Sequence, residues 1–218
     1  MGTMAVSDAT PLRADARRNL ELILDAARAA FAERGLDVGV EEIARRAGVG
    51  KATFFRRFPS KDALILAVLE GFLADVEASA ERAIALDDPW DGLRLFLAEN
   101  ARMQADNVAF FDAMAARYDS GAFPAQLTDR GVAAAEKVLR PARKAGVVRK
   151  GVKAGDLTAM LKMLGAAVRP MPGVQHGERV WMRYLELLLS GIRAGQDPLP
   201  GIAMDPCALA LEACRRGA

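Results

Sequence analysis

Apolar residues return at helical spacing along most of this chain. Between residues 14 and 34 they recur every three or four positions, which predicts an amphipathic helix that ends at Gly35. The apolar stripe of this helix consists of Leu20, Ile23, Leu24, Ala27, Ala30 and Phe31. Because no segment shows the period-two alternation of a half-buried strand, the pattern predicts an all-α fold.

Further helices are expected along the rest of the chain. A long one begins at Ser60, whose hydroxyl can cap it, and ends before the break at Asp87–Pro89. Later helices are expected from Pro89, around Phe110, and over residues 125–145, 155–168 and 178–194, with a last short helix after Pro206.

Residues 40–58 form the most informative stretch, two short helices joined by a tight turn. Ile43 and Ala44 share one face of the first helix, and the small side chain of Ala44 lets a second helix cross closely. Gly48 follows, where a left-handed cap requires the absence of a Cβ. Gly50 stands at the start of the second helix, where glycine is a permitted N-cap.

The second short helix has a surface suited to DNA. Phe54 and Phe58 lie four residues apart and are expected to return to the core. The residues expected to face outward are small, basic or aromatic, namely Lys51, Ala52, Phe55, Arg56 and Arg57. A short helix with these exposed side chains fits the major groove of DNA.

The stretch and its flanks resemble the DNA-binding domain of the tetracycline-repressor (TetR) family. The segments that carry the resemblance are ILDAARAAFAERG at 23–35, VEEIARRAGVGKATFFRRF at 40–58 and FPSKDAL at 58–64. Their three helices and two turns match in order and spacing, and DDPWDGLRLFL and WMRYLELLLSGIRA resemble one subgroup further along. The resemblance implies an N-terminal helix-turn-helix domain followed by a helical domain that binds an effector and dimerises. The predicted boundaries are a disordered arm at 1–12, the DNA-binding domain at 13–61 and the effector-binding and dimerisation domain at 62–218.

The resemblance also implies which residues meet DNA. Thr53 matches the family pattern, and Lys61 stands where the family places a phosphate-binding lysine. Gly39 stands where the family usually carries Ser or Thr, which removes a capping hydroxyl, and Arg57 replaces a histidine with a permanent charge. The residues predicted to bind DNA are Arg17, Arg18, Gly39, Gly50, Lys51, Ala52, Thr53, Phe55, Arg56, Arg57 and Lys61.

Charge is distributed unevenly and supports this interpretation. Between residues 13 and 61 there are 11 Lys/Arg and 7 Asp/Glu, whereas the rest of the chain has 19 and 21. A basic N-terminal quarter on a slightly acidic body is typical of a nucleic-acid-binding head. Arg17 and Arg18 lie in the first part of the first helix, where cations oppose the helix dipole. A nearby DNA backbone would explain them, and a solvated basic arm is the alternative.

Composition limits the other classes of function. The 218 residues are 52% hydrophobic and 27% charged, typical of a globular protein. No run of 18 uncharged apolar residues occurs, so no membrane span is expected, and a cytoplasmic location is predicted. Cys207 and Cys214 are expected to be packing residues, with a functional thiol pair as the alternative. The only histidine is His176. No residue of a second metal-binding type lies at helical spacing from it, so no metal and no cofactor are predicted.

Phenylalanine and methionine recur on the helices that should converge in the C-terminal domain. In the TetR family small molecules bind inside this domain and tilt the helix that follows the DNA-binding head. The residues predicted to bind an effector are Phe72, Phe96, Met103, Phe110, Met114 and Met160. Plain core packing is the alternative, because a stripe of this kind at helical spacing is usually core. The effector is expected to be mostly apolar.

The helix expected at 178–194 is apolar around more than one face. A single buried face needs about 100° of arc, so a second face is covered either by the chain's own core or by a partner subunit. The resemblance implies the partner, with this helix and the one at 155–168 pairing with their copies in a homodimer. The residues predicted at the dimer interface are Met163, Ala167, Trp181, Leu185, Leu188, Leu189 and Ile192.

These predictions together describe a homodimeric, ligand-responsive transcriptional regulator. It is expected to repress transcription by binding a palindromic double-stranded operator, and to be released by a small effector. Two alternatives remain open. One is a helical ligand-binding or scaffold protein without DNA binding, and the other is an enzyme, although no catalytic residue is predicted.

Overall fold

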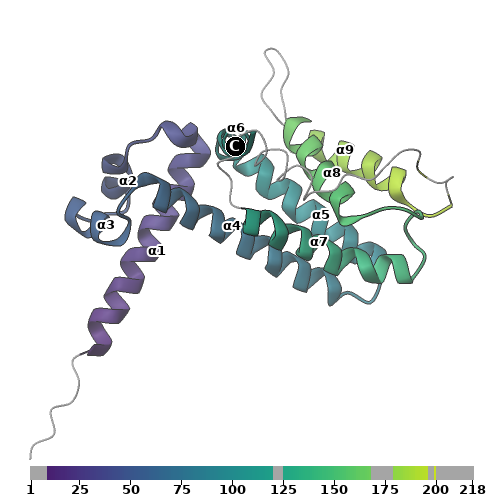
Figure 1. Cartoon of the computed structure of the whole chain (residues 1–218), viewed down its shortest axis with the longest axis horizontal. Coiled ribbons are helices and arrows are strands. Elements are labelled where there is room, and N and C mark those ends of the chain that lie inside the picture. The colour runs from purple at the N-terminus through teal and green to yellow at the C-terminus, as the bar shows by residue number, and fades with distance from the viewer. Residues whose placement is uncertain (1–8, 120–124, 168–178, 196–198, 200–218) are drawn as a thin grey trace, which may run out of the picture. The chain divides into compact units, whose positions relative to one another are not determined.

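The computed structural model describes residues 9–119, 125–167, 179–195 and 199 (Figure 1). The elements in these ranges are α1 (Ala9–Arg34), the 3₁₀ turn η1 (Gly35–Asp37), α2 (Val40–Arg46), α3 (Lys51–Arg57), α4 (Lys61–Ile84), α5 (Pro89–Asp106), α6 (Val108–Asp119), α7 (Ala125–Lys144), α8 (Ala154–Ala167) and α9 (Arg179–Ile192). The predicted all-α fold is confirmed. The predictions for residues 1–8, His176, Cys207, Cys214 and a last short helix fall outside the described residues.

Local chemistry at the helix ends follows the sequence. The Ser60 hydroxyl accepts a hydrogen bond from the Ala63 N–H at 3.1 Å and caps α4, as predicted. Asp88 caps α5 by accepting from the Trp90 N–H at 2.8 Å, with Pro89 in the first turn. The first helix begins at Ala9 rather than near Ala14. The earlier start is possible because Pro11 lies in the first turn, where its missing N–H is no loss.

The chain divides into two compact units, Met1–Leu69 and Glu70–Ala218. The division falls within α4, later than the boundary predicted after Lys61. The buried residues Leu64 and Val68 of α4 group with the N-terminal unit, so the first turns of this helix complete the core of the smaller unit.

The N-terminal unit has a small apolar core supplied by short helices. Ile23, Ala27 and Phe31 of α1 are fully buried, as are Ile43 of α2 and Phe54 of α3. Helices as short as α2 and α3 gain little stability from their own backbone hydrogen bonds. Their position is therefore fixed mainly by the side chains that they bury.

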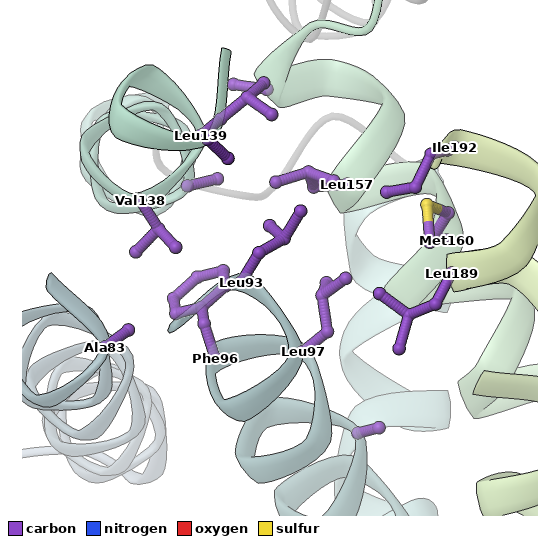
Figure 2. Close-up of a cluster of buried hydrophobic side chains, with 14 of the residues drawn as sticks. Ala83, Leu93, Phe96, Leu97, Val138, Leu139, Leu157, Met160, Leu189 and Ile192 are labelled. Carbon is purple, nitrogen blue, oxygen red and sulfur yellow. The ribbon is translucent and has the colours of Figure 1, made fainter. Parts of the chain in front are cut away.

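The C-terminal unit is built around α5. Figure 2 shows Leu93, Phe96 and Leu97 of this helix pointing into a cluster with side chains from four other helices. The partners labelled there are Ala83 of α4, Val138 and Leu139 of α7, Leu157 and Met160 of α8, and Leu189 and Ile192 of α9. The helix α5 therefore joins the second half of α4 to the C-terminal helices through one continuous core.

Two polar contacts fasten α4 inside this unit. The side chain of Asn100 in α5, almost fully buried, donates to the Ser79 hydroxyl of α4 at 2.9 Å and to the Phe96 carbonyl at 2.7 Å. On the surface, Arg130 of α7 forms a fork onto Glu77 at 2.9 Å and reaches Glu70 at 2.6 Å. The Arg130 hydrogen bond holds the pKa of the Glu77 carboxyl below its usual range.

The helix α9 carries two adjacent apolar strips. The first, made of Trp181, Leu185, Leu189 and Ile192, is buried in the core of its own chain. The prediction that these four residues face a partner subunit is therefore wrong, because the core alternative accounts for them. The second strip, called the exposed strip below, consists of Tyr184, Leu187, Leu188 and Gly191 at positions i, i+3, i+4 and i+7. Within it Leu188 is half-buried against the core, and the other three residues are exposed. Tyr184 is 45% exposed and Leu187 56% exposed.

No helix in the described part of the chain is long and apolar enough to cross a membrane.

The crossing of α4 and α5 generates a prediction about stability. A Cβ added at Gly92 would lie 2.5 Å from the Ala83 carbonyl oxygen, a backbone atom that cannot move away cheaply. We expect Gly92→Ala to lower the free energy of unfolding by about 1–3 kcal/mol, the usual cost of overpacking. Urea denaturation measures the change.

The matched control is Gly131→Ala in α7, where the added Cβ would meet only Leu73 Cδ1 at 3.9 Å. This change should be neutral or stabilising by up to about 1 kcal/mol, because alanine favours the helix. Equal effects of the two substitutions would contradict the close crossing.

Candidate nucleic-acid interface

The turn between α2 and α3 has the geometry that the sequence predicts. Gly48 adopts φ +67°, in the left-handed region, and the Val49 N–H donates to the Ala44 carbonyl at 3.0 Å. Gly50 is the N-cap of α3, and Phe58, the C-cap, is extended and precedes Pro59. Helix, left-handed turn and second helix together form a helix-turn-helix.

Most residues predicted to bind DNA are accessible on this unit. The exposed ones are Arg17, Arg18, Gly39, Gly50, Lys51, Ala52, Phe55, Arg56 and Arg57, whereas Thr53 and Lys61 are half-buried. Phe54 is fully buried and Phe58 nearly so. The two phenylalanines therefore anchor α3, as predicted, and leave its other side chains, apart from the half-buried Thr53, exposed.

Lys51, the first residue of α3, is held by two neighbours. Its ammonium lies 2.8 Å from Oε1 of Glu41 in α2. The same nitrogen lies 5.9 Å from the centre of the Phe55 ring, within the range of a cation–π contact. The Lys51 hydrogen bond, together with a backbone N–H, holds the pKa of the Glu41 carboxyl below its usual range. The Glu41 carboxyl is therefore ionised near neutral pH.

The two arginines at the end of α2 are also paired with carboxylates. Arg45 forks onto Glu42, with nitrogen–oxygen distances of 2.8 and 2.9 Å. Arg46 reaches Glu42 at 3.0 Å and Glu33 of α1 at 2.8 Å. Hydrogen bonds from Arg45 and Arg46 lower the pKa of the Glu42 carboxyl to about 2. This network links α2 to α1 and neutralises much of the positive charge of α2.

Arg56 and Arg57, in the last turn of α3, differ from these residues. Both are exposed, and within the described ranges neither forms an ion pair with a carboxylate. Their guanidinium groups are available for phosphate or base contacts without breaking a bond inside the protein.

Lys61 has a structural contact that the sequence did not suggest. It is half-buried, and its ammonium donates to the Leu36 carbonyl of η1. Lysine has three N–H donors, so this bond still leaves hydrogens for a phosphate. Lys61 thus fastens the start of α4 to the turn after α1, whatever else it binds.

The six residues predicted to bind an effector do not lie in one cluster. Phe96 and Met160 belong to the main core around α5. Phe72 of α4 instead packs on Phe110 and Phe111 of α6, with ring centres 5.1 Å apart in each pair. Met114 is also buried, and Met103 is half-buried.

Reasoning from the sequence missed the polar residues that matter here. Asn100 lies on the same face of α5 as Phe96 and Leu97, and a polar residue within an apolar stripe was a usable signal. Glu41 and Glu42 gave no such signal, because acidic residues are ordinary in the first turn of a helix.

The described residues contain no group of three or more His, Cys, Asp or Glu side chains that could hold a metal ion.

The two units match two known families in turn. Residues 23–68 match the sequence profile described as "Bacterial regulatory proteins, tetR family". Residues 88–194 match the profile described as "Transcriptional regulator SbtR-like, C-terminal domain". The first match contains the helix-turn-helix, and the second contains α5 to α9.

Solved structures of similar chains agree with these matches. A TetR transcription regulatory protein from Mycobacterium vanbaalenii is 31% identical, with 84% of this chain and 100% of that chain covered and a TM-score of 0.63. The TetR transcriptional regulator SCO0520 from Streptomyces coelicolor is 30% identical, with coverages of 81% and 99% and a TM-score of 0.64. SmeT, the repressor of the multidrug efflux pump SmeDEF of Stenotrophomonas maltophilia, is 25% identical, with coverages of 85% and 96% and a TM-score of 0.59. The chain therefore belongs to the TetR family: it is a DNA-binding transcriptional regulator and not an enzyme.

Proposed function

We propose that this regulator is a repressor that binds a palindromic operator as a homodimer and releases it when a small, mostly apolar effector binds. The observation that carries the proposal is the exposed surface of α3 on a helix-turn-helix, with Arg56 and Arg57 unpaired among the described residues. SmeT, a similar chain, is a repressor, which favours repression over activation. Because a transcriptional regulator acts on the chromosome, we expect the protein in the cytoplasm.

Dimerisation is supported by the exposed strip of α9. Leu187 and Tyr184 of this strip are large apolar side chains that remain exposed, as does Met163 of α8 at 53%. Contiguous exposed apolar residues of this kind mark protein–protein contacts. Of the predicted interface residues, Met163, Ala167 and Leu188 remain candidates, and Tyr184, Leu187 and Gly191 join them. A two-fold dimer presents two α3 helices to two half-sites, which is why the operator is expected to be palindromic.

The effector proposal rests on the second cluster of aromatic residues. Phe72, Phe110 and Phe111 join α4 to α6, and Met114 is buried nearby in α6. Methionine adapts to ligands of different shape, and an effector that separates these rings would alter how α4 is held. An effector that binds the DNA-free form 100-fold more tightly would weaken operator binding by up to about 2.7 kcal/mol.

The first prediction for this function concerns phosphate contacts. A duplex selected from random DNA should bind with an affinity that falls steeply with salt. Arg56→Ala and Arg57→Ala should each weaken binding, and loss of one phosphate contact per protomer should reduce the salt slope by about 1.8 for the dimer. Fluorescence anisotropy between about 50 and 200 mM salt measures both quantities.

Arg45→Ala is the matched control, since Arg45 is equally exposed but paired with Glu42. It should change the salt slope much less. An unmodified protein that binds no selected duplex, or binds independently of salt, would contradict the proposed function.

The second prediction separates the two strips of α9. Leu187→Glu places a charge on the exposed strip and should give a folded monomer. Leu189→Glu places the same charge in the core, where Leu189 is 1% exposed, and should unfold the protein. Analytical ultracentrifugation gives the oligomeric state, and circular dichroism gives the helical content. A folded dimer of the Leu187→Glu variant would show that the interface lies elsewhere.

The third prediction concerns the effector site. Met114→Trp adds bulk in α6 at the proposed effector site and should abolish the response of the DNA complex to compounds that release the unmodified protein. Operator affinity should stay within about twofold, because the change lies outside the DNA-binding unit. A screen of small apolar compounds against the DNA complex measures the response. Leu86→Trp, at an exposed position after α4, is the control and should respond normally.

A further inference from the structure

Glu41 lies beside Lys51, one of the residues predicted to bind DNA, although carboxylates are repelled by phosphates. It belongs to the first turn of α2, and its Oε1 lies 2.8 Å from the ammonium of Lys51 in α3. The Lys51 and Glu41 side chains are 65% and 63% exposed. The Lys51 ammonium also lies over the ring of Phe55. The Lys51 side chain is thus restrained on two sides while its remaining hydrogens face solvent.

This pairing changes what Lys51 can bind. A free lysine binds any phosphate, and such contacts supply most of the affinity for DNA of any sequence. A phosphate that approaches Lys51 meets an ammonium already neutralised by Glu41 and is repelled by the carboxylate beside it. A base edge carries no net charge, so the same repulsion does not apply to it. Guanine O6 and N7 can accept from the two N–H groups that Glu41 leaves unused.

We infer that Glu41 is a specificity-determining residue: by restraining Lys51 it suppresses binding to DNA of arbitrary sequence while leaving Lys51 able to read a base. The contrast with Arg56 and Arg57, which have no carboxylate partner among the described residues, supports this division. On α3 the paired cation selects the sequence, and the unpaired cations supply general affinity. The inference rests on the proposed function, since it assumes that α3 meets DNA.

The test compares two duplexes and four proteins. The duplexes are a palindrome selected from random DNA and one of mixed sequence, and the proteins are the unmodified chain, Glu41→Gln, Lys51→Met and the double variant. Glu41→Gln should tighten binding to the mixed-sequence duplex by about three- to tenfold at about 0.1 M salt. It should also steepen the salt slope by about 1.8, one released lysine in each protomer. Binding to the palindrome should change less than about twofold, so the ratio of the two affinities falls. In the Lys51→Met background, Glu41→Gln should tighten mixed-sequence binding much less than in the unmodified chain, because only the direct repulsion between the Glu41 carboxylate and phosphate is then removed.

Asp25→Asn is the matched control, because it removes the same charge from an exposed position of α1. If it tightens mixed-sequence binding as much as Glu41→Gln does, the effect is one of net charge and the inference is overturned. An effect that is equally large without Lys51, or an equal gain for both duplexes, overturns it as well. If the unmodified protein prefers no selected duplex, the proposed function itself has failed, an outcome that is seen before any Glu41 variant is measured.

Discussion

Burial of the Phe54 side chain fixes the recognition helix, and the DNA-binding surface depends on that burial. With seven residues, α3 is too short to be stable as an isolated helix. Phe54 is fully buried and its ring lies 5.9 Å from that of Phe58, which is also in the core. Because these two residues occupy one side of α3, the basic and small residues must occupy the other. The chemistry of the surface follows from the packing beneath it.

Pairing within the protein also determines which charges of the N-terminal unit are available to DNA. The sequence has an excess of basic residues there, but several of them are paired with other groups of the protein. Arg45 and Arg46 are paired with Glu42 and Glu33, and Lys61 donates to a backbone carbonyl. Exposed pairs of this kind contribute little to stability individually, but they decide which cations face DNA without a partner. A count of basic residues therefore overstates the positive surface that a phosphate meets.

Much of this fold could be predicted from the sequence, because the relevant signals are local. The caps at Ser60 and Asp88, the left-handed Gly48 and the periodic apolar stripes depend on neighbouring residues alone. The face of α9 could not be predicted in this way. Its two strips are both apolar, and only the packing of α5 and α8 against α9 determines which strip is buried. The predicted effector residues do not share one cluster for the same reason, since periodicity does not show which helices meet.

The glycine caps of the helix-turn-helix have a consequence for its dynamics. Both α2 and α3 begin at a glycine, Gly39 and Gly50, and neither N-cap has a side-chain hydrogen bond. The first-turn amides of both helices therefore lack the acceptor that serine or threonine would supply. Local opening costs little free energy where backbone amides are exposed and the apolar anchor is small. Amide hydrogens in these turns should exchange with solvent well before those of α5, so DNA binding would order the starts of both helices of the recognition surface.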